Sequence, residues 1–231
     1  MKTIGLLGGM SWESTQTYYR AINEGIRQEI GGLHSAKIVL YSVDFAEIEA
    51  LQMKGDWQSA ATLLTRAAQS IEKAGADFLV ICTNTMHKVA PEIASGIAIP
   101  ILHIAEATAD VLVLDGIRSV GLLGTRFTME QAFYKERLLA RGLDVVTPER
   151  ADRDTVHRII YEELCLGQVR DESRLQYLAI IDQLRARGAE AVILGCTEIS
   201  LLVNQCDTAV ALYDTTVIHA QQAVKAALTA V

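Results

Sequence analysis

Long apolar runs are missing from this sequence of 231 residues, although half of its residues are hydrophobic. A membrane-spanning helix needs about 20 consecutive apolar residues, so we expect no membrane segment. The first residues, MKTIGLLGGM, hold one lysine and a short apolar patch. A secretory signal needs a longer apolar core and a small-residue cleavage site. We therefore expect a cytoplasmic protein.

Cysteines are few, and they lack the spacing of a metal site or of a disulfide framework. The four of them, Cys82, Cys165, Cys196 and Cys206, include no C-x-x-C pair. We expect free thiols and no metal. Basic clusters are missing as well, and the net charge is −7. This balance argues against nucleic acid and anionic membranes as partners.

Common cofactor and hydrolase motifs are also missing. The segment from Gly5 to Met10, GLLGGM, resembles a nucleotide-binding turn, but it is not G-x-G-x-x-G. There is no P-loop, H-E-x-x-H or G-x-S-x-G motif. We expect the loop to bring the N–H groups of Gly9 and Met10 near a small anion. Ser14 and Thr15 are the expected cap of the following helix.

What the sequence does contain is an apolar run that stops abruptly. Phe78–Ile81 is followed by Cys-Thr-Asn-Thr, all small and polar, and then by Met-His-Lys. This pattern is typical of a buried parallel strand that ends at a functional site.

The second half of the chain repeats the first. GADFLVICTNT (75–85) returns as GAEAVILGCTE (188–198) at an offset of 113, and TIGLLG (3–8) returns as SVGLLG (119–124) at 116. Four such blocks in the same order predict an internal duplication, although strand–glycine–helix units also resemble one another by chance. We expect an α/β fold of two pseudo-symmetric Rossmann-like (flavodoxin-like) domains with the active site in the cleft between them. The predicted domains are 1–98 with 209–231, and 99–208.

The repeat places Thr83 opposite Cys196. Cys82 points to the other face of its strand, because side chains alternate, and is expected in the core. Cys196 has two interpretations that the sequence leaves open. It is a small buried hydrophobe, or a thiol at a helix N-terminus whose thiolate is stabilised for use as a base or nucleophile near neutral pH.

Two further positions have open roles. His87, four residues after Thr83, could tune or bind a ligand, and a structural role is equally compatible with its place. Gln52 corresponds to Cys165 when the offset of 113 is extended, which suggests a place at the pocket edge for both.

Five blocks together, GLLGGMS, CTNTMH, LLGTRFTME, LGCTE and DTTVIHA, resemble the aspartate/glutamate racemase family over nearly the whole chain. The resemblance implies a cofactor-independent amino-acid racemase, and a homodimer. It also implies two thiols on opposite faces of the substrate Cα. Inversion by deprotonation needs a base on one face and an acid on the other.

The chain departs from the family pattern at Thr83, where the family has its first cysteine. Thr83 and Cys196 are the implied catalytic pair, as in the L-aspartate/glutamate-specific branch, which the chain resembles most. The resemblance implies that Cys196 deprotonates L-Asp or L-Glu and that Thr83 returns the proton, directly or through water. A hydroxyl is a far poorer base than a thiol, so the rates in the two directions should differ.

Without a cofactor as electron sink, preorganised donors must stabilise the carbanion. The expected substrate-binding residues are Met10, Gln52, Asn84, Thr85, Thr125, Thr197 and Glu198. Arg126 and Lys88 are candidates for the distal group. Three alternatives stay open: a broader-specificity racemase, a single-thiol decarboxylase or cis–trans isomerase of small diacids, and a non-catalytic module that binds small acids.

Overall fold

The computed structural model describes residues 1–229, which form two compact units. The first unit contains Met1–Ile104 together with the C-terminal segment from His219, and the second contains Ala105–Ile218. Each unit is built around its own parallel sheet.

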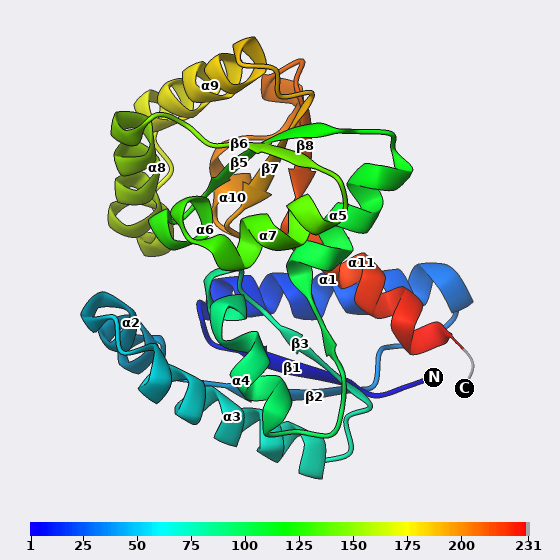
Figure 1. Cartoon of the computed structure of the whole chain (residues 1–231). Helices are drawn as coiled ribbons and strands as arrows, with labels where there is room; N and C mark the ends of the chain where they lie inside the picture. Colours follow the sequence, from blue (N-terminus) through cyan, green and yellow to red (C-terminus); the bar gives the residue numbers. More distant parts are fainter. Residues whose placement is uncertain (230–231) are drawn as a thin grey trace. The chain divides into compact units, whose positions relative to one another are not determined.

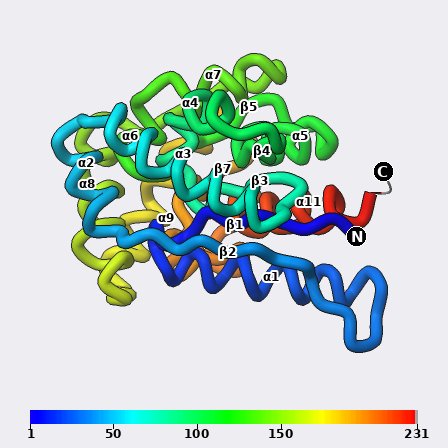
Figure 2. The backbone as a smooth tube through the Cα atoms, turned by 90° about the horizontal axis from the view of Figure 1, so that it is seen from below, coloured from blue at the N-terminus to red at the C-terminus, as the bar shows by residue number. Residues whose placement is uncertain are grey.

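The first sheet has the strand order β2-β1-β3-β4. Its strands are β1 (Ile4–Gly8), β2 (Ile38–Ser42), β3 (Phe78–Ile81) and β4 (Ile101–Leu102). Figure 1 shows α1 and α11 on one side of these strands and α3 on the other, and Figure 2 shows β1 and β2 running side by side. The helices are α1 (Trp12–Ile30), α2 (Phe45–Lys54), α3 (Trp57–Lys73), α4 (Ala90–Ser95) and α11 (Thr215–Leu228), with a 3-10 turn at Thr85–Val89. The central strands β1 and β3 are buried along their whole length, which explains their unbroken apolar sequences.

The second sheet has the matching order β6-β5-β7-β8. Its strands are β5 (Ser119–Gly124), β6 (Asp144–Val146), β7 (Ala191–Gly195) and β8 (Ala211–Asp214). Apolar residues of α8 and α9 pack on β5 and β7, and Figure 1 shows both helices beside this sheet. The other helices are α5 (Ile104–Leu114), α6 (Arg126–Glu130), α7 (Ala132–Ala140) and α10 (Ile199–Leu202), next to α8 (Arg150–Glu162) and α9 (Asp171–Ala186); 3-10 turns span Leu164–Leu166 and Gln205–Asp207.

The duplication extends to side-chain detail at the start of the central strands. Asp77 accepts a hydrogen bond from the Thr3 N–H at 2.6 Å and returns one from its own N–H to the Thr3 carbonyl at 2.8 Å. Glu190 makes the same reciprocal pair with Ser119, at 3.1 and 2.9 Å. The predicted fold class, two related α/β domains, is confirmed by these two matching sheets.

The last helix of each half belongs to the unit of the other half. Helix α5 follows the first sheet in sequence, but from Ala105 onward it lies in the second unit. There Glu106 and Asp110 form ion pairs with Arg137 of α7 and with Arg141 at its C-terminal cap. Helix α11 follows the second sheet, but its later turns pack on β1, β3 and α1 of the first unit.

The unit boundaries therefore differ from the predicted domain boundaries. Sequence analysis places residues 99–104 in the second domain and 209–218 in the first. Strand β4 instead pairs with β3 in the first sheet, and β8 pairs with β7 in the second. The chain passes from one unit to the other after the fourth strand of each sheet rather than before it, because that strand completes its own sheet.

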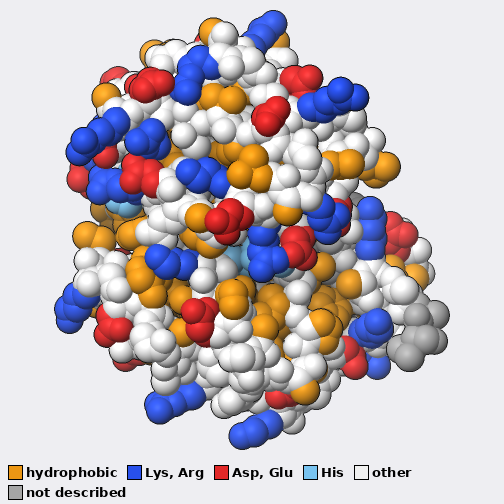
Figure 3. All heavy atoms as spheres, viewed as in Figure 1, with side chains coloured by type: hydrophobic (Ala, Val, Ile, Leu, Met, Phe, Trp, Pro, Cys, Tyr) orange, Lys and Arg blue, Asp and Glu red, His pale blue; other side chains and the backbone are white. Residues whose placement is uncertain are grey.

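Charged side chains of both signs are interspersed over the surface shown in Figure 3. Within residues 1–229, no helix has the length and apolar character needed to cross a membrane. The same residues contain no group of three or more His, Cys, Asp or Glu side chains arranged to hold a metal ion.

Candidate functional site

The carboxyl end of β1 leads into a tight loop. Gly9 has a φ of +91°, and a Cβ there would lie 2.2 Å from the carbonyl oxygen of Val43, so only glycine fits. Its N–H donates to Oγ1 of Thr15 at 2.8 Å. The prediction that this N–H holds an anion is wrong, because the loop already uses it. The Met10 side chain is buried in the apolar cluster of α2 and α3.

Ser11, rather than Ser14 or Thr15, caps α1. Its side chain accepts a hydrogen bond from the Ser14 N–H at 3.2 Å. The two expected cap residues have other partners, since Thr15 holds Gly9 and the Ser14 hydroxyl donates to the carbonyl of Cys82 at 2.9 Å. These bonds join the loop after β1 to the end of β3.

The end of β3 carries the predicted Thr-Asn-Thr segment. Cys82 is fully buried in the α1 and α11 cluster, as expected for a core residue, and burial raises the pKa of its thiol far above the ordinary value. Asn84 and Thr85 are also buried, whereas Thr83 remains partly exposed. Thr83 is therefore the member of this segment that a solute can reach.

His87 supports the Thr83 segment by a hydrogen bond to its backbone. Its Nδ1 lies 2.8 Å from the carbonyl oxygen of Thr83, and its Nε2 accepts the N–H of Ile104 at 3.2 Å. Because Nε2 accepts, the ring proton is assigned to Nδ1, which donates to Thr83. His87 is thus a neutral, buried imidazole that fixes the backbone of Thr83.

A second buried histidine nearby is also neutral. His219 lies 2.8 Å from both the Tyr18 hydroxyl and the Leu102 carbonyl. Burial lowers the pKa of His219 to about 4. The rings of His103 and His219 lie 4.5 and 5.8 Å from that of His87, measured between centroids. This histidine cluster was not predicted from the sequence, where its members lie far apart.

Gln52 reaches the same region from α2. It is 4% exposed, and its Nε2 lies 2.9 Å from the sulfur of Met86. A buried side-chain amide next to the Thr83 segment can donate to a polar solute. Gln52 and Thr83 are within one unit.

The second unit carries the predicted thiol at the end of β7. The Cys196 sulfur lies 3.0 Å from Oε2 of Glu198, and the Thr197 hydroxyl donates to the same oxygen at 2.6 Å. Cys196 and Glu198 are 9% and 7% exposed. A carboxylate that accepts two hydrogen bonds is placed to take the thiol proton.

The prediction of a thiolate stabilised by a helix N-terminus is wrong. Burial raises the pKa of Cys196 well above its usual value, and the charge of Glu198 raises it further. Helix α10 has only four residues and begins at Ile199, three positions after the thiol. The resting thiol is therefore protonated, and any activation must come from Glu198 or from a bound molecule.

The remaining residues predicted for the site differ in what they contact. Thr125 caps α6 through its side chain, which the Thr128 N–H approaches at 3.4 Å. Arg126 pairs with Asp154 at 3.0 Å, and the Lys88 ammonium lies 4.1 Å from the Trp57 ring centre. Both cations proposed for the distal group thus have partners in their own unit. Cys165 packs against the cluster that contains Cys196.

The Asp/Glu/Hydantoin racemase family model matches residues 7–223. The chain belongs to this family. A solved structure of a proposed Asp/Glu racemase from Yersinia pestis is 57% identical, has a TM-score of 0.94, and is matched over 99% of this chain and 100% of that one. An aspartate racemase homologue from Pyrococcus horikoshii OT3 is 33% identical, with a TM-score of 0.86 over the same shares. RacX of Bacillus subtilis (strain 168), a broad specificity amino-acid racemase, is 22% identical over 96% of each chain.

The family recognised from five sequence blocks is confirmed, and so is the assignment of the chain to the racemases, a class of isomerases. Racemase activity needs groups that give and take protons. Thr83 follows β3 and Cys196 follows β7, at the carboxyl end of the third strand of each unit.

Proposed function

We propose that the protein interconverts the enantiomers of aspartate or glutamate, and that Cys196 and Thr83 act on opposite faces of the substrate Cα. The observation that carries this proposal is the hydrogen bond of 3.0 Å from the Cys196 thiol to a buried carboxylate, Glu198. A racemase must form a base from a protonated thiol, and this bond supplies a path for the proton.

The reaction with L-substrate runs in four steps. The Cys196 thiol passes its proton to the Glu198 carboxylate. The thiolate takes the Cα proton, and the electron pair moves into the α-carboxylate to give an enediolate. Thr83 then donates a proton to the other face of Cα, directly or through water, and exchange with water resets all three groups. Buried donors stabilise the enediolate because they need no reorganisation as charge develops.

The substrate-binding residues proposed from the sequence lie in both units. Met10, through its backbone N–H, belongs with Gln52, Asn84 and Thr85 to the first unit, and Thr125, Thr197 and Glu198 belong to the second. The Asn84 amide and the threonine hydroxyls are suitable donors to carboxylate oxygens. We propose Gln52 for the distal carboxylate, because its buried amide lies beside Met86, close to the Thr83 segment.

The experiment is solvent exchange at Cα in D2O. L-Asp and L-Glu should take up deuterium faster than their D-enantiomers. Cys196→Ser should abolish exchange, whereas Cys206→Ser, which alters an exposed thiol, should have no effect. Thr83→Cys should raise exchange from the D side, and absence of that gain would remove Thr83 from the mechanism. A chain that exchanges no amino acid would refute the racemase proposal.

A broader-specificity racemase is the second candidate, and the likeness to RacX over nearly the whole chain favours it. The same assay with a panel of neutral and basic L-amino acids separates the two. Exchange confined to Asp and Glu supports the first, and comparable exchange with several others supports the second. We also propose a homodimer, in line with the family resemblance.

A further inference from the structure

The turn that follows β7 is fixed by a serine side chain. The Ser200 hydroxyl on α10 donates a hydrogen bond to the carbonyl of Thr197 at 3.0 Å. The Thr197 hydroxyl donates to Oε2 of Glu198 at 2.6 Å, and the same oxygen accepts the Cys196 thiol at 3.0 Å. Ser200 thus holds the backbone of the residue that orients Glu198 beside the thiol.

Asp214, at the end of β8, reaches Ser200 from the neighbouring strand. Its carboxylate is hydrogen bonded to the Ser200 hydroxyl, so the hydroxyl proton is shared between this carboxylate and the Thr197 carbonyl. Oδ1 of Asp214 also accepts the N–H groups of Thr216 and Val217 at 2.8 and 3.3 Å, at the start of α11. The backbone of α11 therefore orients the carboxylate that contacts Ser200.

The next residue along the chain, Thr215, supports the other side of the thiol. It is fully buried, and its hydroxyl donates to the carbonyl of Leu194 at 2.9 Å. Leu194 lies two residues before Cys196, and Thr197 lies one residue after it. The end of β8 thus fixes the backbone on both sides of Cys196, by one direct hydrogen bond and one that passes through the serine.

The first unit has a supporting side chain at the position equivalent to Ser200. The offset of 113 that pairs Thr83 with Cys196 also pairs His87 with Ser200. Nδ1 of His87 lies 2.8 Å from the carbonyl oxygen of Thr83, and Oγ of Ser200 lies 3.0 Å from that of Thr197. Both halves therefore place a donor side chain on the backbone of the segment after the third strand.

The position of Asp214 also has a polar counterpart in the first unit. By strand register His103, the residue after β4, corresponds to Asp214. The rings of His103 and His87 lie 4.5 Å apart between centroids, and they occupy the two positions at which Asp214 and Ser200 meet in the second unit. Two imidazoles thus lie behind the Thr83 segment, whereas a hydroxyl and a carboxylate lie behind the thiol segment.

We propose that Ser200 and Asp214 are positioning residues for the proton transfer between the thiol and Glu198. They act through the backbone of Thr197, whose hydroxyl orients the Glu198 carboxylate. Misplacing a reacting group by about 1 Å can slow a reaction by about 100-fold. Hydrogen bonds that fix this turn therefore affect the rate through Glu198. This inference rests on the proposed function for the role of Glu198 as proton acceptor.

Ser200→Ala, at a half-buried position, tests the proposal by two measurements on one protein. Exchange of the Cα proton of L-Asp in D2O should fall by about 10- to 100-fold. Because the charge of Glu198 raises the pKa of Cys196, the pH profile of iodoacetamide alkylation at Cys196 should shift to lower pH when the carboxylate moves away. A residue that only stabilises the fold would leave this profile of the folded protein unchanged.

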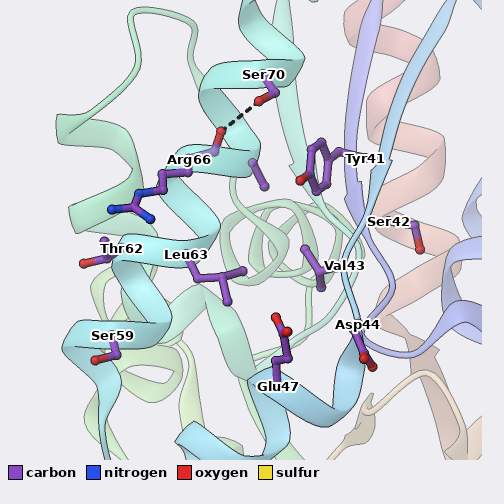
Figure 4. Close-up of a pocket in the computed structure, with 11 residues that line it drawn as sticks. Tyr41, Ser42, Val43, Asp44, Glu47, Ser59, Thr62, Leu63, Arg66 and Ser70 are labelled. Atoms are coloured by element: carbon purple, nitrogen blue, oxygen red, sulfur yellow. Dashed lines mark hydrogen bonds between the residues drawn. The ribbon is translucent and has the colours of Figure 1, made fainter.

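Conservative variants and a matched control separate the hydrogen bonds from other effects. Ser200→Thr keeps the hydroxyl and should retain most of the exchange. Asp214→Asn keeps a hydrogen-bonding group beside Ser200 and should do the same, whereas Asp214→Ala should lower exchange as Ser200→Ala does. Ser70→Ala removes a hydroxyl that donates to the Arg66 carbonyl at 3.1 Å on the exposed side of α3 (Figure 4). It should change neither measurement.

Three results would overturn the proposal. If exchange and alkylation of Ser200→Ala both match those of the unmodified protein, the bond to Thr197 is dispensable. If exchange falls and the alkylation profile does not move, Glu198 keeps its place without that bond. If Ser200→Thr loses as much exchange as Ser200→Ala, the hydroxyl is not the cause. A chain that exchanges no amino acid would refute the proposed function alone, because a shifted alkylation profile in Ser200→Ala would still support the positioning of Glu198.

Discussion

Replacing Glu198 by glutamine separates two effects of this carboxylate on the Cys196 thiol. The carboxylate raises the pKa of the thiol by its charge, and in the proposed reaction it accepts the thiol proton. Glutamine keeps the shape of the side chain and removes both the charge and the ability to take a proton. The thiol should therefore ionise more readily while the reaction becomes slower.

The size of the first effect follows from the distance of 3.0 Å between Cys196 and Glu198. Two unit charges about 3 Å apart interact by about 5.5 kcal/mol at an effective dielectric constant of about 20, which is an upper bound. Relaxation of nearby dipoles reduces this energy, and removing the charge of Glu198 should lower the pKa of Cys196.

Iodoacetamide reacts with the thiolate and not with the thiol, so the pH dependence of alkylation reports the pKa. Mass spectrometry of the Cys196 peptide separates this residue from the other cysteines. In Glu198→Gln the alkylation profile should shift to lower pH, and Cα exchange with L-Asp should fall by about 100- to 10,000-fold, the usual contribution of a general base. Glu149→Gln, at an exposed carboxylate of the same unit, should change neither.

Two results would refute the reasoning. If the thiol ionises more readily and exchange rises with it, Glu198 only opposes ionisation and another group accepts the proton. If the alkylation profile does not move, the charge of Glu198 does not govern the thiol.

Three further predictions concern the framework of the first unit. His219 is neutral in the fold with a pKa of about 4, below its ordinary 6.5, so the unfolded chain takes up a proton first as pH falls. Urea unfolding should therefore show that the free energy of unfolding decreases between about pH 6.5 and 4, by up to about 3 kcal/mol. His219→Gln should reduce this pH dependence. Gly9→Ala should destabilise the protein by more than about 2 kcal/mol because it clashes with Val43 and strains the backbone; a smaller loss of melting temperature than Gly31→Ala, where space is open, would contradict this. His87→Phe should reduce exchange from the D side more than from the L side, because it removes the support of Thr83; equal losses would mean that His87 serves stability alone.

The sequence predicted the strand ends well because a change from apolar to polar residues marks each end. An apolar run that is buried on both faces must stop where polar side chains begin, so the ends of β3 and β7 could be placed within a residue or two. The duplication then selected Thr83 and Cys196 over Cys82. Each of these inferences uses only local pattern and repetition.

The electrostatics of the site could not be predicted in the same way. A Gly-Cys-Thr-Glu sequence before a helix suggests a lowered thiol pKa. The actual direction depends on how deeply Cys196 is buried, on how short α10 is, and on the side chain of Glu198 turning back toward the sulfur. Likewise Ser14 and Thr15 are residue types that often cap helices. Their hydroxyls instead form hydrogen bonds with the Cys82 carbonyl and the Gly9 N–H.

The exchange of α5 and α11 has a consequence for the independence of the two halves. A fragment that ends after α5 carries a helix its own sheet does not use, and it lacks α11, which covers β1 and β3. The C-terminal fragment lacks α5 and carries α11, which packs on the sheet of the first unit. We therefore expect neither half to fold on its own, although each contains a complete sheet.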